Sequence, residues 1–172
     1  MEFSKLLEER ASTRKYLGTM PTEDQINTVI AAGLRAPSGR NLQAPIIVAV
    51  TDKETIDKLS RANAAVMGVD TDPFYSAPAV FVVLAKKSAR TYAYDGSISL
   101  GYMMLAAHDI GLGSCWIHRA REVMAQPEWQ EWLRSLGIED EVEGVGNLIL
   151  GYPDGEFAEP KTVADGRVYF VK

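Results

Sequence analysis

Seven residues near the N-terminus place three cations and two aliphatic hydroxyls together: Arg10-Ala11-Ser12-Thr13-Arg14-Lys15-Tyr16. In an extended backbone alternate side chains share a face, so Arg10, Ser12 and Arg14 would point the same way over roughly 13 Å. Guanidinium groups donate paired hydrogen bonds to phosphate oxygens, and a serine hydroxyl adds a short neutral one. The tract therefore predicts a phosphate site, with a solvated basic turn between two helices as the alternative.

The remaining candidates for protein-based catalysis give weaker signals. Cys115 and His118 are three residues apart, a spacing that a nucleophile and its base could use. No acid or amide is placed to orient the imidazole, and the flanking residues are apolar, which favours a buried, inert thiol. Two histidines and one cysteine cannot form a structural zinc site, so we expect no metal. If the chain is an enzyme, a bound cofactor must carry the chemistry.

Composition restricts the classes of protein to which the chain can belong. Its 172 residues are 47% hydrophobic, enough for one ordinary core, so we expect a single domain over residues 1–172. A net charge of −5 and a pI near 5.1 argue against a broad nucleic-acid surface. One cysteine fits a reducing compartment, and no window has 18 consecutive apolar residues. We expect a soluble, cytoplasmic protein that binds neither nucleic acid nor membrane.

Hydrophobic periodicity predicts helices and strands that alternate along the chain. Helices are expected at 2–9, from Thr22 to Ala36 with a Thr22/Gln25 capping box, at 93–110, and at 121–136 with a break at Pro127. Strands are expected at 46–50, 79–84, 114–117, 145–150 and 167–171. This order predicts an α/β sandwich with helices on both faces of the sheet.

Three of these segments carry further expectations. The continuous apolar run at 46–50 predicts a strand buried on both faces. The helix at 93–110 is apolar on nearly every side, which is typical of a buried helix. The terminal strand at 167–171 is separated from the others by polar residues, so it could pair with another subunit.

Four motifs together resemble the nitroreductase family. They are Arg10-x-Ser12-x-Arg14-x-Tyr16, then Ala36-Pro37-Ser38-Gly39-Arg40-Asn41-Leu42-Gln43, then Gly111-Leu112-Gly113-Ser114-Cys115-Trp116, and finally Leu150-Gly151-Tyr152-Pro153. Each motif is weak alone, but their order and spacing fit from the first helix to the last strand. The resemblance implies an α/β (α+β) sandwich with a central mixed sheet flanked by helices, in an intertwined homodimer.

The resemblance also implies FMN at the dimer interface, with NAD(P)H as reductant. Arg10, Ser12 and Arg14 inherit the phosphate and ribityl contacts. The loop that would reach the flavin ring from the partner subunit supplies Pro37, Ser38, Gly39, Asn41 and Gln43. Beside the ring on the first subunit the resemblance places Ser114, Cys115, Trp116, Ile117 and His118. Lys161 and Arg167 are the C-terminal cations that could complete the phosphate site.

The physical chemistry of these residues agrees with the implied cofactor. Asn41 and Gln43 offer both donors and acceptors, which the pyrimidine edge of a flavin requires. Cations or amides near the ring stabilise the negative charge that a reduced flavin develops. His118 could contact flavin or substrate, or cap the next helix.

Three functions follow as hypotheses. The first is an FMN-dependent NAD(P)H oxidoreductase that transfers hydride by a ping-pong mechanism to nitroaromatic, quinone or similar small-molecule electron acceptors. The second is a flavin-binding module that stores or senses FMN without turnover. The third is an anion-binding or scaffold protein without flavin, under which Asn41 and Gln43 have no role. The segment 118–144 is short for the helical lid of larger family members, and the sequence indicates neither the acceptor nor NADH against NADPH.

Overall fold

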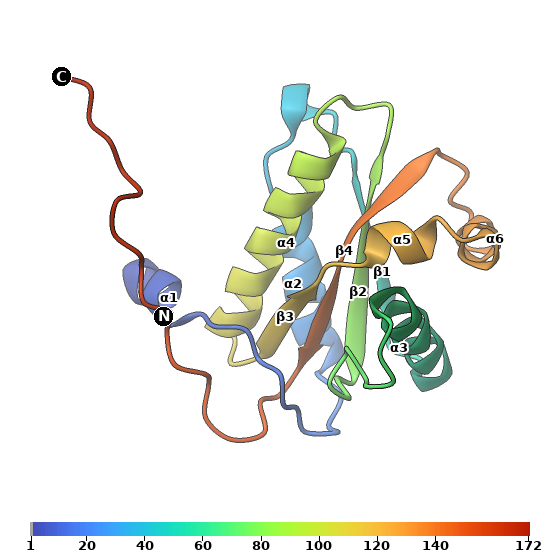
Figure 1. Cartoon of the computed structure of the whole chain (residues 1–172), viewed down its shortest axis with the longest axis horizontal. Coiled ribbons are helices and arrows are strands. Elements are labelled where there is room, and N and C mark those ends of the chain that lie inside the picture. Colours follow the sequence, from blue (N-terminus) through green and yellow to red (C-terminus); the bar gives the residue numbers. More distant parts are fainter. Residues whose placement is uncertain (1) are drawn as a thin grey trace.

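The computed structural model describes residues 2–172 and is built around one four-stranded sheet (Figure 1). The strand order is β1-β2-β4-β3, and the three pairings between these strands are all antiparallel. The strands are β1 (Pro45–Val50), β2 (Ala79–Lys86), β3 (Gly113–Ile117) and β4 (Val142–Gly151). The helices are α1 (Phe3–Glu9), α2 (Glu23–Leu34), α3 (Lys53–Met67), α4 (Tyr92–Asp109), α5 (Ala120–Met124) and α6 (Pro127–Ser135), with a 3₁₀ turn η1 (Gly39–Asn41).

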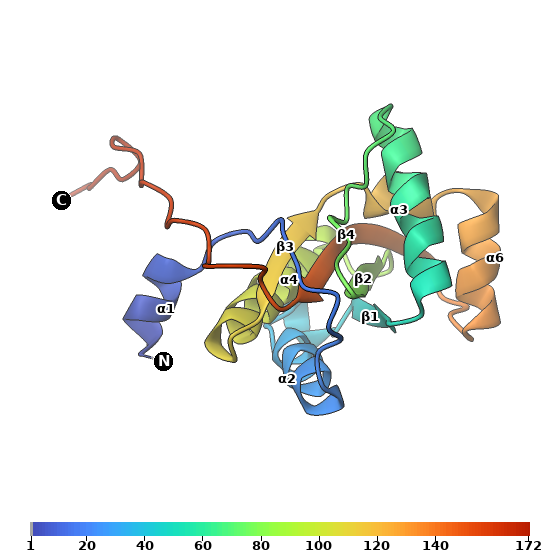
Figure 2. The ribbon, with the colours of Figure 1, turned by 90° about the horizontal axis from the view of Figure 1, so that it is seen from below.

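Helices cover both faces of the sheet, as predicted (Figures 1 and 2). On one face α3, α5 and α6 pack against alternate strand residues such as Val80, Val82 and Ile149. On the other face α2 and α4 pack against the intervening residues, including Phe81 and Leu148. This alternation is the period-2 pattern of a strand buried on both sides, and it gives the protein two hydrophobic cores separated by the sheet.

Several local signals in the sequence act as predicted. The Thr22 side chain accepts a hydrogen bond from the Gln25 amide at 3.3 Å, and the Gln25 side chain accepts one from the Thr22 amide at 2.9 Å. This capping box starts α2. Pro127 occupies the first turn of α6, where its missing N–H costs nothing, and so separates α6 from α5.

Two predictions about burial are wrong. β1 is an edge strand with β2 as its one neighbour, so most of its residues are only partly buried. Along α4 the side chains of Tyr94, Ile98 and Tyr102 are 74%, 41% and 43% exposed. These three residues are four apart and form one stripe on the helix face that points away from the sheet and α2. We call them the α4 stripe.

The predicted strand at 167–171 is absent from this chain. Residues 155–172 form an exposed tail that runs away from the sheet beside α1 (Figures 1 and 2). The tail has no sheet edge beside it, so its backbone groups have no ladder to join. Among the described residues, no helix is both long enough and apolar enough to cross a membrane.

Candidate functional site

The basic tract, residues 10–16, is extended and lies against the free edge of β3. Ser12 forms a parallel bridge with Ser114, and the Thr13 amide donates to the Ser114 carbonyl at 3.0 Å. Further along, Tyr16 forms an antiparallel bridge with Pro153. The parallel part of the predicted mixed sheet is confined to the bridge at Ser12. The contact brings the first and third sequence motifs together.

Tyr16 and Gly113, two motif residues to which the sequence assigned no role, fix the tract in this position. The Tyr16 hydroxyl donates to the Thr13 carbonyl at 2.7 Å, and burial raises the pKa of Tyr16 well above its ordinary value, which keeps this donor protonated. Gly113 is needed for close approach, since a Cβ there would lie 2.5 Å from the Thr13 hydroxyl oxygen. Glycine in a strand often marks a close approach of another backbone, so Gly113 itself was a sequence signal for this contact.

Four side-chain donors on the basic tract and in the segment that begins with β3 are buried without a hydrogen-bond partner among the described residues. Arg10 Nη1 and Thr13 Oγ1 are buried without a partner in the described part of the chain. Trp116 Nε1, on β3, and Arg119 Nε, two residues past its end, are in the same state. Buried donors are nearly always paired, because an unpaired one retains its full desolvation cost. Arg10 Nη1, with the exposed guanidinium of Arg14 on the same extended tract, therefore fits a ligand rich in acceptor oxygens, such as a phosphate ester.

The β3 residues divide into packed and accessible side chains. Ser114, Cys115 and Ile117 are buried, and Cys115 Sγ makes only a weak contact with the Trp116 carbonyl at 3.8 Å. Trp116 is partly exposed, and its indole lies across Gly146. His118 is exposed, and α5 begins without a side-chain cap, so the capping role considered for His118 is not observed. Trp116 and His118 are therefore the side chains at 114–118 that reach the surface of this chain.

The second motif, residues 37–43, lies at the opposite end of α4 from the basic tract. The Gly39 amide donates to Asp95 Oδ1 at 3.0 Å in the first turn of α4. Arg10 lies near His108, in the last turn of α4. Burial lowers the pKa of His108, the Glu9 carboxylate opposes this shift, and the positive charge of Arg10 lowers the pKa further, which shows that Arg10 is close to the imidazole. At about 1.5 Å per residue, Asp95 and His108 are roughly 20 Å apart along the helix axis. One chain therefore does not bring the loop to the tract.

The exposed loop has a strained backbone conformation closed by a hydrogen bond. Arg40, Asn41 and Gln43 have φ values of 52°, 55° and 50°, a left-handed conformation that costs energy for residues other than glycine. The Gln43 amide donates to Ser38 Oγ at 2.9 Å, which closes the loop. Pro37, Asn41 and Gln43 are exposed, so the amide side chains are presented to solvent in this chain.

The two C-terminal cations are not brought to the tract. Lys161 and Arg167 lie on the exposed tail, and neither has an ion pair among the described residues. The tail does pass close to the tract at its start, where the rings of Phe157 and His108 meet edge to face at 4.5 Å. A role for either cation at the phosphate stays a prediction.

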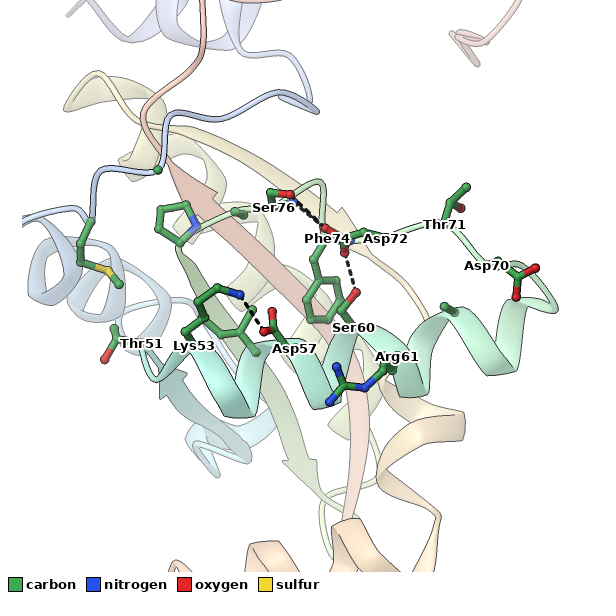
Figure 3. A pocket seen from close by; sticks show the side chains of 16 residues that line it. Thr51, Lys53, Asp57, Ser60, Arg61, Asp70, Thr71, Asp72, Phe74 and Ser76 are labelled. Atoms are coloured by element: carbon green, nitrogen blue, oxygen red, sulfur yellow. Dashed lines mark hydrogen bonds and ion pairs between the residues drawn. The ribbon is translucent and has the colours of Figure 1, made fainter.

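A cavity of about 600 Å³ lies elsewhere, between α3 and residues 70–78 (Figure 3). None of the predicted site residues lines it. Asp72 accepts hydrogen bonds from Ser60 Oγ at 2.5 Å and from the amides of Phe74 and Ser76 at 2.8 and 2.6 Å. Although burial raises the pKa of Asp72, these bonds together lower it below its usual range. Ser60 and Asp72 thus hold the loop at residues 72–76 in place against α3.

Comparisons with known proteins agree with this arrangement. The chain matches the family model described as the nitroreductase family over residues 7–71 and 67–152. A protein from Archaeoglobus fulgidus assigned as an NADH dehydrogenase/NAD(P)H nitroreductase is 29% identical, over 90% of this chain and 87% of that protein. The FMN reductase [NAD(P)H] of Bacillus subtilis is 27% identical, over 88% of this chain and 66% of the relative.

The fold comparison covers the chain from end to end. The crystal structure of a nitroreductase with bound FMN from Bacteroides fragilis superimposes with a TM-score of 0.89 at 26% identity, and each chain is covered over 100% of its length. The family model itself accounts for well over half of the residues. This chain belongs to the nitroreductase family.

Proposed function

We propose that residues 1–172 form one FMN-binding domain of an NAD(P)H oxidoreductase that reduces nitroaromatic, quinone or similar acceptors. The observation that carries the proposal is the buried, unpaired Arg10 Nη1 on the extended basic tract that bridges to β3. Bound FMN would supply hydride chemistry in two half-reactions, first accepting from NAD(P)H and then donating to the acceptor. The relatives named above for FMN reduction and nitroreduction support the same class of reaction.

The chain's own residues would bind the cofactor by its charged end. Arg10 and Arg14 would neutralise the phosphate, and Ser12 would donate one further hydrogen bond. Trp116 and His118 would border the ring on the same subunit. Asn41 and Gln43 would present amide donors to the ring from the partner subunit, where they orient the pyrimidine edge and stabilise negative charge on it.

The homodimer in this proposal rests on the surface of α4. The α4 stripe is apolar and exposed, and Leu42, in the loop at the N-terminal end of the helix, is 56% exposed. Exposed apolar side chains that form a continuous row indicate a protein interface. A second copy seated on the stripe would bury it and could bring its 37–43 loop toward the basic tract, as the separation along α4 requires.

Reconstitution tests the proposal directly. The purified protein, incubated with FMN and desalted, is expected to retain flavin absorbance bands in the blue and near ultraviolet. With NADH or NADPH it should bleach those bands, and adding a quinone or nitroaromatic should restore them with continuous consumption of the reductant. A protein that stays colourless contradicts flavin binding altogether. Bleaching without turnover on any acceptor would instead favour the storage or sensing module.

We expect Cys115→Ser to retain FMN affinity and NAD(P)H oxidation. The thiol is 4% exposed and packs into the hydrophobic core under β3, where a substrate cannot reach it. A hydroxyl at this position needs a hydrogen-bond partner, so the free energy of unfolding should fall by about 1–3 kcal/mol. Urea titration measures that loss. A stable variant that is reduced by NAD(P)H but passes no electrons onward would instead make the thiol part of the reaction.

A further inference from the structure

Asp95 is an acidic side chain buried at the start of the largely apolar helix α4. It is 3% exposed, in the first turn of α4. Its Oδ1 accepts from the Gly39 amide at 3.0 Å, and its Oδ2 accepts from Thr91 Oγ1 at 3.1 Å. Burying a carboxyl group is costly unless it is paired, and a helix N-terminus favours negative charge. Asp95 is therefore built into a specific connection between α4 and a loop 56 positions away in sequence.

The backbone at Gly39 packs too closely against α4 to accept a side chain. A Cβ on Gly39 would lie 2.1 Å from Thr91 Oγ1, so the loop backbone rests directly on the Thr91 side chain. Thr91 and Asp95 are one helical turn apart and face the loop together. Together Thr91 and Asp95 form a contact site, called the seat, that has space only for glycine and orients the Gly39 N–H toward Asp95.

The loop needs an external anchor because its internal bonds define its shape but not its position. The Asn41 amide donates to the Ser38 carbonyl and the Leu42 amide to the Gly39 carbonyl, both within the segment. Among the hydrogen bonds of residues 37–43 in the described structure, the bond from Gly39 to Asp95 is the one that leaves the segment. Three left-handed residues follow Gly39 and store strain, so a loosened anchor would let this segment relax.

We propose that Asp95 and Thr91 are positioning residues for the flavin: by holding Gly39 they set where Asn41 and Gln43 meet the ring. The inference rests on the proposed function, because Asn41 and Gln43 matter only if they contact FMN. It assigns to α4 a role beyond the core, since the same helix would carry the subunit contact and the anchor of the loop. Displacement of the amides by even about 1 Å would weaken hydrogen bonds to the ring.

The test compares Asp95→Ala, Asp95→Asn and Thr91→Val with wild type. Ser99→Ala is the matched control, because Ser99 is buried on the same helix and its hydroxyl bonds the Gly33 carbonyl at 2.9 Å rather than the loop. In the protein without flavin, amide hydrogen exchange at residues 38–43 should be faster in Asp95→Ala than in wild type. It should be unchanged in Ser99→Ala, even if both variants melt at lower temperature.

With FMN added, Asp95→Ala should raise the dissociation constant about tenfold and shift the midpoint potential of the bound flavin. Asp95→Asn keeps an acceptor for the Gly39 amide and should restore affinity to within about threefold of wild type. Thr91→Val removes one bond and tests the same seat if Asp95→Ala does not fold. If Asp95→Ala and Thr91→Val both keep the wild-type rate of loop hydrogen exchange, FMN affinity and flavin midpoint potential, this inference is wrong while the proposed function still stands. A wild-type protein that binds no FMN would overturn the proposed function.

Discussion

Ile98→Glu is expected to separate the subunits of the proposed homodimer and to release FMN in the same step. Ile98 is the middle residue of the α4 stripe, and in a symmetric dimer its replacement introduces two charges into one interface. A buried, unpaired charge costs about 3 kcal/mol or more, which raises the dimer dissociation constant at least about a hundredfold. Because the proposed flavin site uses both chains, cofactor affinity should fall with the dimer.

Sedimentation velocity with detection at a flavin wavelength measures both effects at once. Val66→Glu is the matched control, since Val66 is an apolar side chain on α3 with 37% exposure, close to the 41% of Ile98. The control should stay dimeric and yellow. An Ile98→Glu protein that remains a dimer with bound FMN would place the interface somewhere other than the α4 stripe. A folded monomer that keeps FMN tightly would instead show that one chain suffices for the site.

The behaviour of α4 also shows where sequence patterns stop being informative. Its ends were predictable from periodicity, as were the capping box at Thr22 and the break at Pro127, because these signals act over one or two helical turns. Local sequence does not determine whether an apolar side chain packs into the core of its own chain or lies on the surface, where a second copy could cover it. Ile98 and Leu100 have the same kind of side chain, yet one is exposed and the other fully buried.

The candidate site divides in the same way. Arg10, Ser12 and Arg14 could be chosen from residue type and spacing, since an extended tract places them on one face. The partner strand could not be chosen, because the bridge from Ser12 to Ser114 joins segments about a hundred residues apart. Asp95 did leave a signal, as the one acid in the first turn of a largely apolar helix. The sequence did not indicate its partner, because the Gly39 amide that bonds to it comes from a distant loop.

Arg10→Ala is expected to weaken FMN binding about ten- to a hundredfold while riboflavin affinity stays unchanged. Arg10 Nη1 is buried without a protein partner, so a phosphate would meet a donor that has already lost its water. A charge-assisted hydrogen bond of this kind contributes about 1.5–3 kcal/mol, which converts to that range of affinity. Riboflavin has the same ring and ribityl chain but no phosphate, so its comparison isolates the contact.

Arg14→Ala supplies the internal comparison, because Arg14 is exposed and its contact with a phosphate would be more strongly screened by water and salt. Its effect on FMN should be the smaller of the two and should shrink further at high ionic strength. Quenching of flavin fluorescence gives the dissociation constants of FMN and riboflavin for wild type and both variants, and thermal melts verify that both variants fold. Removal of Arg10 should cost little stability, since it deletes a donor that is unpaired in the protein without ligand. Equal losses for FMN and riboflavin would mean that Arg10 supports the ring or the fold, and the basic tract would then no longer be the phosphate site.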